Sequence, residues 1–230
     1  MLTLAEKPYL AIQGEGLNAG KPVIFVRTLG CNLACGFCDT KYTWHKDHIH
    51  EADVQKFAEQ DFAEYLIKNF PTCSHVVFTG GEPTLQYKAI LRVIFRLKEV
   101  GWTFEIETNG TIEVPSEFVQ QFTPYTISPK LKNSNNEKKK RERWEVLKPL
   151  IEHANVVVKL VVKGREELEE VVGFVEKGGI KPQNVILMPE GVHSFQVLAR
   201  SKEVMEMCLE HGFRFSTRLH VLAYEATRGV

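Results

Sequence analysis

Short runs of β-branched and aromatic residues recur along the chain, and stretches with a helical repeat of apolar positions alternate with them. Runs of this kind, bounded by glycine, proline or polar residues, are typical of β-strands. Six strands are predicted in this way, over residues 23–29, 75–80, 102–108, 125–128, 156–162 and 184–190. The alternation of strands with helical stretches predicts a mainly parallel sheet with helices packed outside it.

The helical stretches have apolar residues three and four positions apart, a spacing that places them on one face of a helix. Four helices are predicted, over residues 51–70, 90–97, 168–175 and 194–211. The apolar face of the first comprises Val54, Phe57, Ala58, Phe62, Tyr65 and Leu66. Each of the four helices therefore has one side suited to packing against a sheet.

Polar and glycine-containing motifs follow four of the predicted strands. They are GCNLACGFCDT at 30–40, TGGEP at 79–83, ETNGT at 107–111 and SPK at 128–130. Six strands can form an open doubly wound sheet or an incomplete barrel, and periodicity does not distinguish the two. In both architectures functional groups collect beyond the carboxyl ends of the parallel strands. We therefore expect the four motifs to meet on one face of the molecule.

Composition and charge exclude some classes of partner. The chain has 230 residues, enough for one core, and its 43% hydrophobic and 25% charged residues are ordinary for a globular protein. Its 29 basic and 29 acidic residues balance, so no broad surface for nucleic acid or an anionic membrane is expected. Neither a signal peptide nor a membrane-length apolar run is evident. We expect one domain over residues 1–230, located in the cytoplasm.

Two further features carry less information. The segment 130–144 is polar and densely basic, and because charge runs are usually solvated, we predict an exposed loop leading into an exposed helix. Cys73 and Cys208 are isolated in the sequence and are interpreted as buried or incidental thiols. Together with three clustered cysteines they do not resemble a disulfide framework, so a reducing compartment is indicated.

The three clustered cysteines, Cys31, Cys35 and Cys38, have the spacing CxxxCxxC. A structural zinc ion needs four ligands, and a histidine between residues 45 and 50 could supply the fourth. A [4Fe-4S] cluster instead takes one thiolate at each iron, so three cysteines would leave one iron open to another ligand. An open position is what a reactive cluster requires. The spacing alone leaves both kinds of site possible.

The residues around the cysteines extend this pattern. CxxxCxxC with Phe37 before the last cysteine resembles the signature of the radical S-adenosylmethionine (SAM) superfamily, whose open iron binds the methionine part of SAM. Further stretches resemble the family of 7-carboxy-7-deazaguanine synthases within it, namely IQGEG at 12–16, FVRTLGCNLACGFCDT at 25–40, TGGEPTLQ at 79–86, LMPEG at 187–191 and RLHVLAYEATRGV at 218–230. The resemblance spans nearly the whole chain. It implies an incomplete (β/α)6 barrel in which the segments near 45–72 and 130–144 vary.

The resemblance also implies a reaction. Members of the family are carbon–nitrogen lyases that convert 6-carboxy-5,6,7,8-tetrahydropterin to 7-carboxy-7-deazaguanine with loss of ammonia, in queuosine and 7-deazapurine biosynthesis. A 5′-deoxyadenosyl radical derived from SAM removes hydrogen from carbon 6 of the pterin, and Mg²⁺ assists the ring contraction. The implied cofactors are a [4Fe-4S] cluster, SAM and Mg²⁺. The implied partners are an electron donor of the flavodoxin or ferredoxin class and a second copy of the chain in a homodimer.

Site residues follow from matching these motifs position by position. Cys31, Cys35 and Cys38 would bind the cluster, and the Thr40 hydroxyl would bind Mg²⁺. For SAM the resemblance implies contacts from Phe37, Cys38, Asp39, Gly81, Glu82, Glu107, Thr108, Asn109, Ser128, Pro129, Lys130 and Met188. For the substrate it implies contacts from Ile12, Gln13, Gly14, Glu15, Arg27, Thr79, His220 and the terminal Val230.

Two of these assignments also have a chemical basis in the sequence. Arg27 follows an apolar run on the strand that leads to the cysteines, and a guanidinium can bind a substrate carboxylate through two hydrogen bonds. In TGGEP the glycines are expected to let the backbone approach SAM closely. The alternatives are a radical SAM activase that acts on a protein and a non-catalytic zinc or iron–sulfur module.

Overall fold

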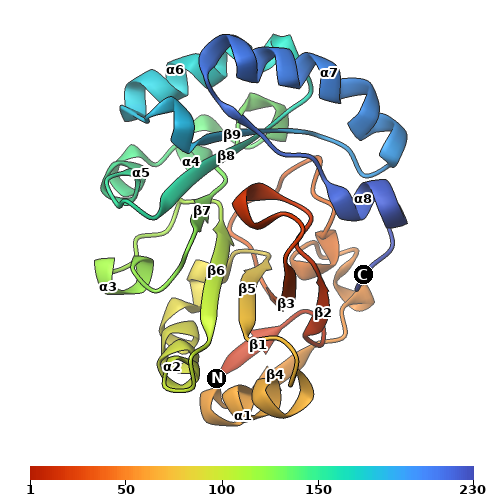
Figure 1. The fold of residues 1–230 in the computed structure, drawn as a ribbon, viewed down its shortest axis with the longest axis vertical. Coiled ribbons are helices and arrows are strands. Elements are labelled where there is room, and N and C mark those ends of the chain that lie inside the picture. Colours follow the sequence, from red (N-terminus) through yellow and green to blue (C-terminus); the bar gives the residue numbers. More distant parts are fainter.

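A sheet of ten strands forms the centre of the computed structural model, which describes all residues 1–230 (Figure 1). The strand order is β10-β9-β8-β7-β6-β5-β3-β1-β4, and β2 pairs with β3. The strands are β1 Leu2–Leu4, β2 Tyr9–Ile12, β3 Pro22–Thr28, β4 Gln55–Phe57, β5 His75–Gly80, β6 Thr103–Thr108, β7 Tyr125–Ile127, β8 Val156–Val162, β9 Val185–Pro189 and β10 Arg214–Phe215.

The strand order distinguishes the two architectures that the sequence left open. Strands β3, β5, β6, β7, β8 and β9 are the six predicted strands, and they lie side by side in chain order with every pair parallel. A doubly wound sheet would reverse its order at a switch point, and this sheet does not. The edge strands β4 and β10 are not paired with each other, so the barrel is open. The predicted incomplete (β/α)6 barrel is confirmed.

Helices connect the parallel strands and cover the outside of the sheet. They are α1 Glu59–Asn69, α2 Tyr87–Lys98, α3 Ser116–Val119, α4 Lys138–Arg141, α5 Trp144–Ile151, α6 Leu168–Gly178, α7 Ser194–His211 and α8 Leu219–Tyr224. In Figure 1, α6 and α7 lie outside β8 and β9, and α1 and α2 lie together at the other end. The predicted apolar face of α2 is fully buried, and the core is one continuous cluster of 39 buried side chains. None of the helices combines the length and apolar character that crossing a membrane requires.

The predicted helix over residues 51–70 is wrong in its first half. Residues 55–57 form β4, which pairs antiparallel with β1 so that Phe57 lies opposite Leu2, and the helix begins only at Glu59. Val54 is 42% exposed and contributes nothing to a helix face. Pairing with β1, in a register that joins Leu4 to Gln55 and Leu2 to Phe57, satisfies the backbone here, and a local apolar repeat cannot reveal such a pairing.

The segment 130–144 is only partly the exposed loop that its charge predicted. The three lysines that begin α4 are exposed, in agreement with the prediction. Leu131, Ser134 and Arg141, however, are buried, and the Arg141 guanidinium contacts Glu170 at 2.8 Å. The segment therefore packs against the barrel, with only its lysine-rich part facing solvent.

Candidate active site

A cavity of about 670 Å³ opens at the carboxyl ends of the parallel strands, where the four motifs were expected to meet. Of the predicted site residues, it is lined by Ile12, Gln13, Glu15, Arg27, Cys31, Cys35, Phe37, Cys38, Asp39, Thr40, Thr79, Gly81, Glu107, Thr108, Asn109, Ser128, Lys130, Met188, His220 and Val230. Gly14, Glu82 and Pro129 lie outside its lining. One face of the barrel therefore brings together residues from both ends of the chain.

The glycines of TGGEP have a packing role that the sequence did not indicate. A Cβ on Gly81 would lie 2.0 Å from the carbonyl oxygen of Gly30, the residue just before Cys31. Gly81 N donates to Thr28 O at 3.0 Å, and Glu82 N donates to Gly30 O at 2.7 Å. Only glycine permits this approach, so the end of β5 holds the start of the cysteine loop in place.

Glu82, which the sequence predicted as a SAM contact, is engaged by groups of the protein. Its carboxylate is fully buried and accepts hydrogen bonds from Thr84 N at 3.0 Å, Thr84 Oγ1 at 2.5 Å, Thr108 Oγ1 at 2.5 Å and Asn109 N at 2.7 Å. These donors come from the ends of β5 and β6 and occupy both carboxylate oxygens. In this structure Glu82 ties two strand ends together behind the cavity.

The three cysteine thiols fit a cluster better than a single ion. All three line the cavity, and burial, with smaller contributions from Glu82 and from the Cys35 and Cys38 sulfurs, raises the pKa of Cys31 to about 12. No three His, Cys, Asp or Glu side chains are grouped so as to hold a single metal ion. A cubane takes each thiolate at a different corner, and this arrangement suits it.

Two side chains outside CxxxCxxC donate hydrogen bonds to these sulfurs. Asn136 Nδ2 lies 3.2 Å from Cys35 Sγ, and Trp44 Nε1 lies 3.3 Å from Cys38 Sγ. Hydrogen bonds from protein N–H groups are the usual surroundings of iron-bound thiolates. The residues present therefore fit a [4Fe-4S] cluster held by three cysteines.

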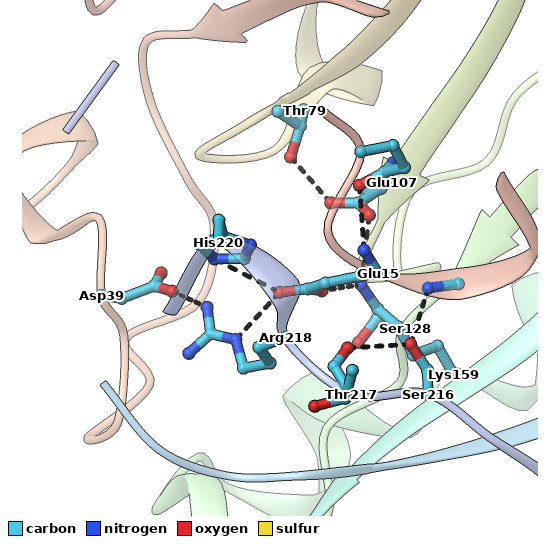
Figure 2. A network of polar contacts seen from close by, with 12 residues as sticks. Glu15, Asp39, Thr79, Glu107, Ser128, Lys159, Ser216, Thr217, Arg218 and His220 are labelled. Atoms are coloured by element: carbon cyan, nitrogen blue, oxygen red, sulfur yellow. Dashed lines mark hydrogen bonds and ion pairs between the residues drawn. The ribbon is translucent and has the colours of Figure 1, made fainter. Parts of the chain in front are cut away.

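Charged side chains that line the cavity, most of them buried, form a network of ion pairs (Figure 2). Lys159, from the middle of β8, contacts Glu15 Oε2 at 2.6 Å and Glu107 Oε1 at 3.1 Å. Arg218 Nε donates to Glu15 Oε1 at 2.9 Å, and its Nη2 pairs with Asp39. Arg218 thereby links the IQGEG segment, which carries Glu15, to the cysteine loop, which carries Asp39.

Charge complementarity keeps this network ionised despite its burial. Burial would raise the pKa of Glu15, but Lys159 and Arg218 outweigh that effect and hold the pKa well below its usual range. The pKa of Lys159 is raised in return by Glu107 and Glu15. Burial lowers the pKa of His220, 3.9 Å from Glu15, so this imidazole is neutral at pH 7. The cavity therefore offers fixed charges on one side and a neutral imidazole beside them.

The IQGEG segment is held by groups from distant parts of the chain. The Gln13 side chain donates to the buried Glu105 at 2.9 Å, so its amide nitrogen is already engaged by the protein. Leu219 N donates to Gly14 O at 3.0 Å, and a Cβ on Gly14 would meet His220 Nδ1 at 2.2 Å. The glycine at 14 lets His220 pack against the segment, which explains why Gly14 itself is absent from the cavity wall.

Two cations in the cavity retain capacity for an anion. Arg27 Nε pairs with Glu6 at 2.8 Å and its Nη2 contacts the Tyr9 hydroxyl at 3.2 Å, while Nη1 has no protein partner. Lys130 Nζ donates to Ser128 Oγ at 2.9 Å and has no acidic side chain within 4 Å. Each can therefore accept a carboxylate without first losing a salt bridge.

The chain end folds back over the cysteine loop. The Arg228 guanidinium lies 3.5 Å from the Tyr42 ring centroid, and Val230 is part of the cavity wall. Thr40, in the same region, places its Oγ1 3.6 Å from Cys38 Sγ. Thr40 and Val230 thus both line the cavity, where the sequence predicted them.

Four residues of the site were missed by the sequence analysis: Trp44, Asn136, Lys159 and Arg218. Only Lys159 carried a usable signal, because a lysine in the middle of the apolar run VVVKLVV must face a polar interior or a partner. Asn136 lay inside a segment that its charge marked as solvated. Trp44 follows the cysteine motif without a pattern of its own, and Arg218 is the first residue of the motif at 218–230 but was given no role there.

Comparison with known proteins agrees with this geometry. Residues 25–177, which include the three cysteines and the motifs after β5, β6 and β7, match the family model of the radical SAM superfamily. The chain is 32% identical to a 7-carboxy-7-deazaguanine synthase of Halobacterium salinarum, over 93% of this chain and 87% of that protein. It is 31% identical to one of Pyrobaculum aerophilum, over 96% and 94%. The crystal structure of QueE from Escherichia coli matches with a TM-score of 0.74 at 27% identity, over 95% of this chain and 94% of that one.

Proposed function

The chain belongs to the radical SAM superfamily and, within it, to the 7-carboxy-7-deazaguanine synthases, and from this premise we propose how its cavity is used. It is a radical SAM enzyme of the queuosine pathway, and the family implies a [4Fe-4S] cluster and SAM. A non-catalytic metal module and an activase of another protein are thereby set aside. We propose that the substrate is 6-carboxy-5,6,7,8-tetrahydropterin and the product 7-carboxy-7-deazaguanine.

One observation carries the proposal: the cavity that holds the three thiols also holds cations with free capacity and a fixed charge network. When bound, the cluster and SAM supply the radical chemistry, and the protein supplies position and electrostatics. Cys31, Cys35 and Cys38 bind three irons. Lys130 and Ser128 bind the SAM carboxylate, since Lys130 is a cation at the cavity wall without an acidic partner.

On the substrate side, the unpaired Nη1 of Arg27 binds the pterin carboxylate with a charge-assisted hydrogen bond. The pterin ring has amine and amide edges, which the carboxylates of Glu15 and Glu107 and the neutral imidazole of His220 can bind. Lys159 contacts both carboxylates and so holds them in position. These residues would hold the ring in one orientation in the cavity.

Mg²⁺ belongs to the proposal as a third group. Thr40 lines the cavity beside Cys38 and supplies one hydroxyl, and the other ligands are waters and substrate oxygens, as is usual for this ion. The requirement is tested by omitting Mg²⁺ and by Thr40→Val, which removes the hydroxyl but keeps the shape. Each change is expected to lower turnover while leaving cluster content unchanged.

The substrate is tested by anaerobic incubation of reconstituted protein with SAM, a reductant, Mg²⁺ and the carboxytetrahydropterin. Mass spectrometry is expected to show the deazapurine and stoichiometric ammonia. Cys35→Ser serves as the control without a competent cluster. An intact cluster that cleaves SAM but forms no deazapurine would contradict the substrate while leaving the family intact.

The remaining partners are also part of the proposal. The reductant is a flavodoxin or ferredoxin, the protein works as a homodimer, and it is located in the cytoplasm. All five cysteines are free thiols, which supports a reducing compartment. Light scattering of the cluster-loaded protein tests the dimer, and a molecular mass of one 26.3 kDa chain would refute it.

A further inference from the structure

Asn136 joins the basic segment 130–144 to the cysteine loop through both ends of its amide. Its Oδ1 accepts the Ala34 backbone N–H at 2.9 Å, and its Nδ2 donates to Cys35 Sγ at 3.2 Å. A backbone N–H can bond only to the amide oxygen, so the orientation of the group is fixed by Ala34. The NH₂ group must therefore face the sulfur.

The turn that carries Asn136 is built to make this contact. Gly36 N donates to Ser134 O at 3.0 Å, and the buried Ser134 hydroxyl donates to Leu131 O at 2.7 Å. Asn135 has a φ of 63°, in the left-handed region that asparagine tolerates. A Cβ on Gly36 would lie 2.9 Å from Asn135 Nδ2, so glycine at 36 lets the two loops close on each other.

A second donor, from Trp44, reaches a second cysteine. Trp44 Nε1 lies 3.3 Å from Cys38 Sγ, and the indole N–H can only donate. Trp44 is half-buried and lines the cavity, and its ring packs edge-on against His45 at 5.1 Å. Two of the three thiols thus have a side-chain N–H aimed at them.

We propose that Asn136 and Trp44 are positioning residues that raise the reduction potential of the cluster. The inference rests on the assignment of Cys31, Cys35 and Cys38 as its ligands. One-electron reduction adds negative charge to the cluster and its thiolates, and an N–H donor stabilises the more negative state. Removing a donor therefore makes reduction harder.

For each lost hydrogen bond we expect the ratio of reduced to oxidised cluster at a given potential to change about tenfold. For a one-electron couple this is a shift of the midpoint potential by about 59 mV. Hydrogen bonds from outer residues to metal ligands commonly change site properties by factors of 10 to 100. The two donors act on different sulfurs, so their effects are expected to add in the double variant.

The test is an anaerobic redox titration of reconstituted protein, followed by electron paramagnetic resonance of the reduced cluster. Trp44→Phe removes only the N–H and keeps an aromatic ring. Asn136→Leu removes the amide and leaves no charge. Asn135→Gly is the matched control, because glycine keeps the left-handed turn and no sulfur bond is lost. Lower midpoints are expected for the two donor variants and an unchanged midpoint for the control, at equal iron content.

A second variant at Asn136 makes the test independent of how well Asn136→Leu binds the cluster. Asn136→Asp preserves the acceptor for Ala34 N and so the loop, but places a carboxylate oxygen beside Cys35 Sγ, and its midpoint should fall further. Intact clusters with wild-type midpoints in Trp44→Phe and Asn136→Asp would overturn the inference. Failure of the proposed substrate has a different signature, namely shifted midpoints in the variants but no deazapurine from the wild type.

Discussion

The link that Arg218 makes between Glu15 and Asp39 gives a prediction that can be worked out from the structure. Arg218 is 8% exposed and uses three nitrogens, on Glu15, on Asp39 and on the carbonyl oxygen of Gly191. Arg218→Met keeps an unbranched apolar stem but removes the guanidinium and with it all three bonds. Glu15 then depends on Lys159 alone, and a buried carboxylate has lost one of its two cations.

Removing one partner of a buried ion pair costs about 3–5 kcal/mol of unfolding free energy. Two features place Arg218→Met near the lower value. Lys159 still contacts Glu15 at 2.6 Å, and the Asp39 side chain is 41% exposed and can be solvated. We expect a loss of about 3 kcal/mol, which corresponds to roughly 6–12 °C in melting temperature for a chain of this size.

A double-mutant cycle separates the ion pair from packing. Glu15→Gln alone is expected to cost about 2 kcal/mol, because Lys159 retains Glu107 and Arg218 retains Asp39. If the two residues stabilise each other, the double variant loses about 3 kcal/mol of unfolding free energy, although the losses of the two single variants sum to about 5 kcal/mol. The difference, about 2 kcal/mol, is the coupling energy between Glu15 and Arg218.

The assay is anaerobic urea unfolding of cluster-loaded protein, followed by tryptophan fluorescence and circular dichroism at matched iron content. The surface pair Arg165–Glu210, whose side chains are 42% and 47% exposed, is the control. Arg165→Met is expected to cost less than about 1 kcal/mol. Independent sites add within about 0.5 kcal/mol, so a coupling below that value would refute the account of the network.

Three further predictions concern other parts of the site. Glu82→Gln places an NH₂ group against a donor such as Thr108 Oγ1, so the free energy of unfolding in urea titrations should fall by about 2 kcal/mol. An unchanged free energy would refute the role of Glu82 in joining the ends of β5 and β6. Deleting residues 228–230 should abolish turnover, measured as product formation, but lower the free energy of unfolding by less than about 1 kcal/mol, measured through the melting temperature. A truncated protein that is still active would contradict this prediction. The pKa of Glu15 is lowered from 4.5 because Lys159 and Arg218 outweigh its burial, and Arg218 lowers the pKa of Asp39 from 3.8, so their stabilisation is complete at neutral pH and is lost as pH falls below about 4.5. Urea titrations at several pH values test this, and a loss of stability already at pH 6 would point to other groups.

The sequence alone determined the parallel core and the location of the site. Runs such as VVVKLVV are too apolar to face water, and parallel strands put their carboxyl ends at one edge, so the motifs after β3, β5, β6 and β7 had to meet. The thiol spacing and the motifs also indicated the cofactor class. These properties depend on local composition and on order along the chain, which a sequence displays directly.

Only the tertiary structure decided how the site is held together. The partnership of Arg218 with Glu15 spans 203 residues, and that of Asn136 with Cys35 spans 101. The sheet order excluded the doubly wound alternative, and β4 replaced half of a predicted helix because β1 was available to pair with it. Long-range pairings satisfy buried polar groups, and the chain must fold before it shows which groups they join.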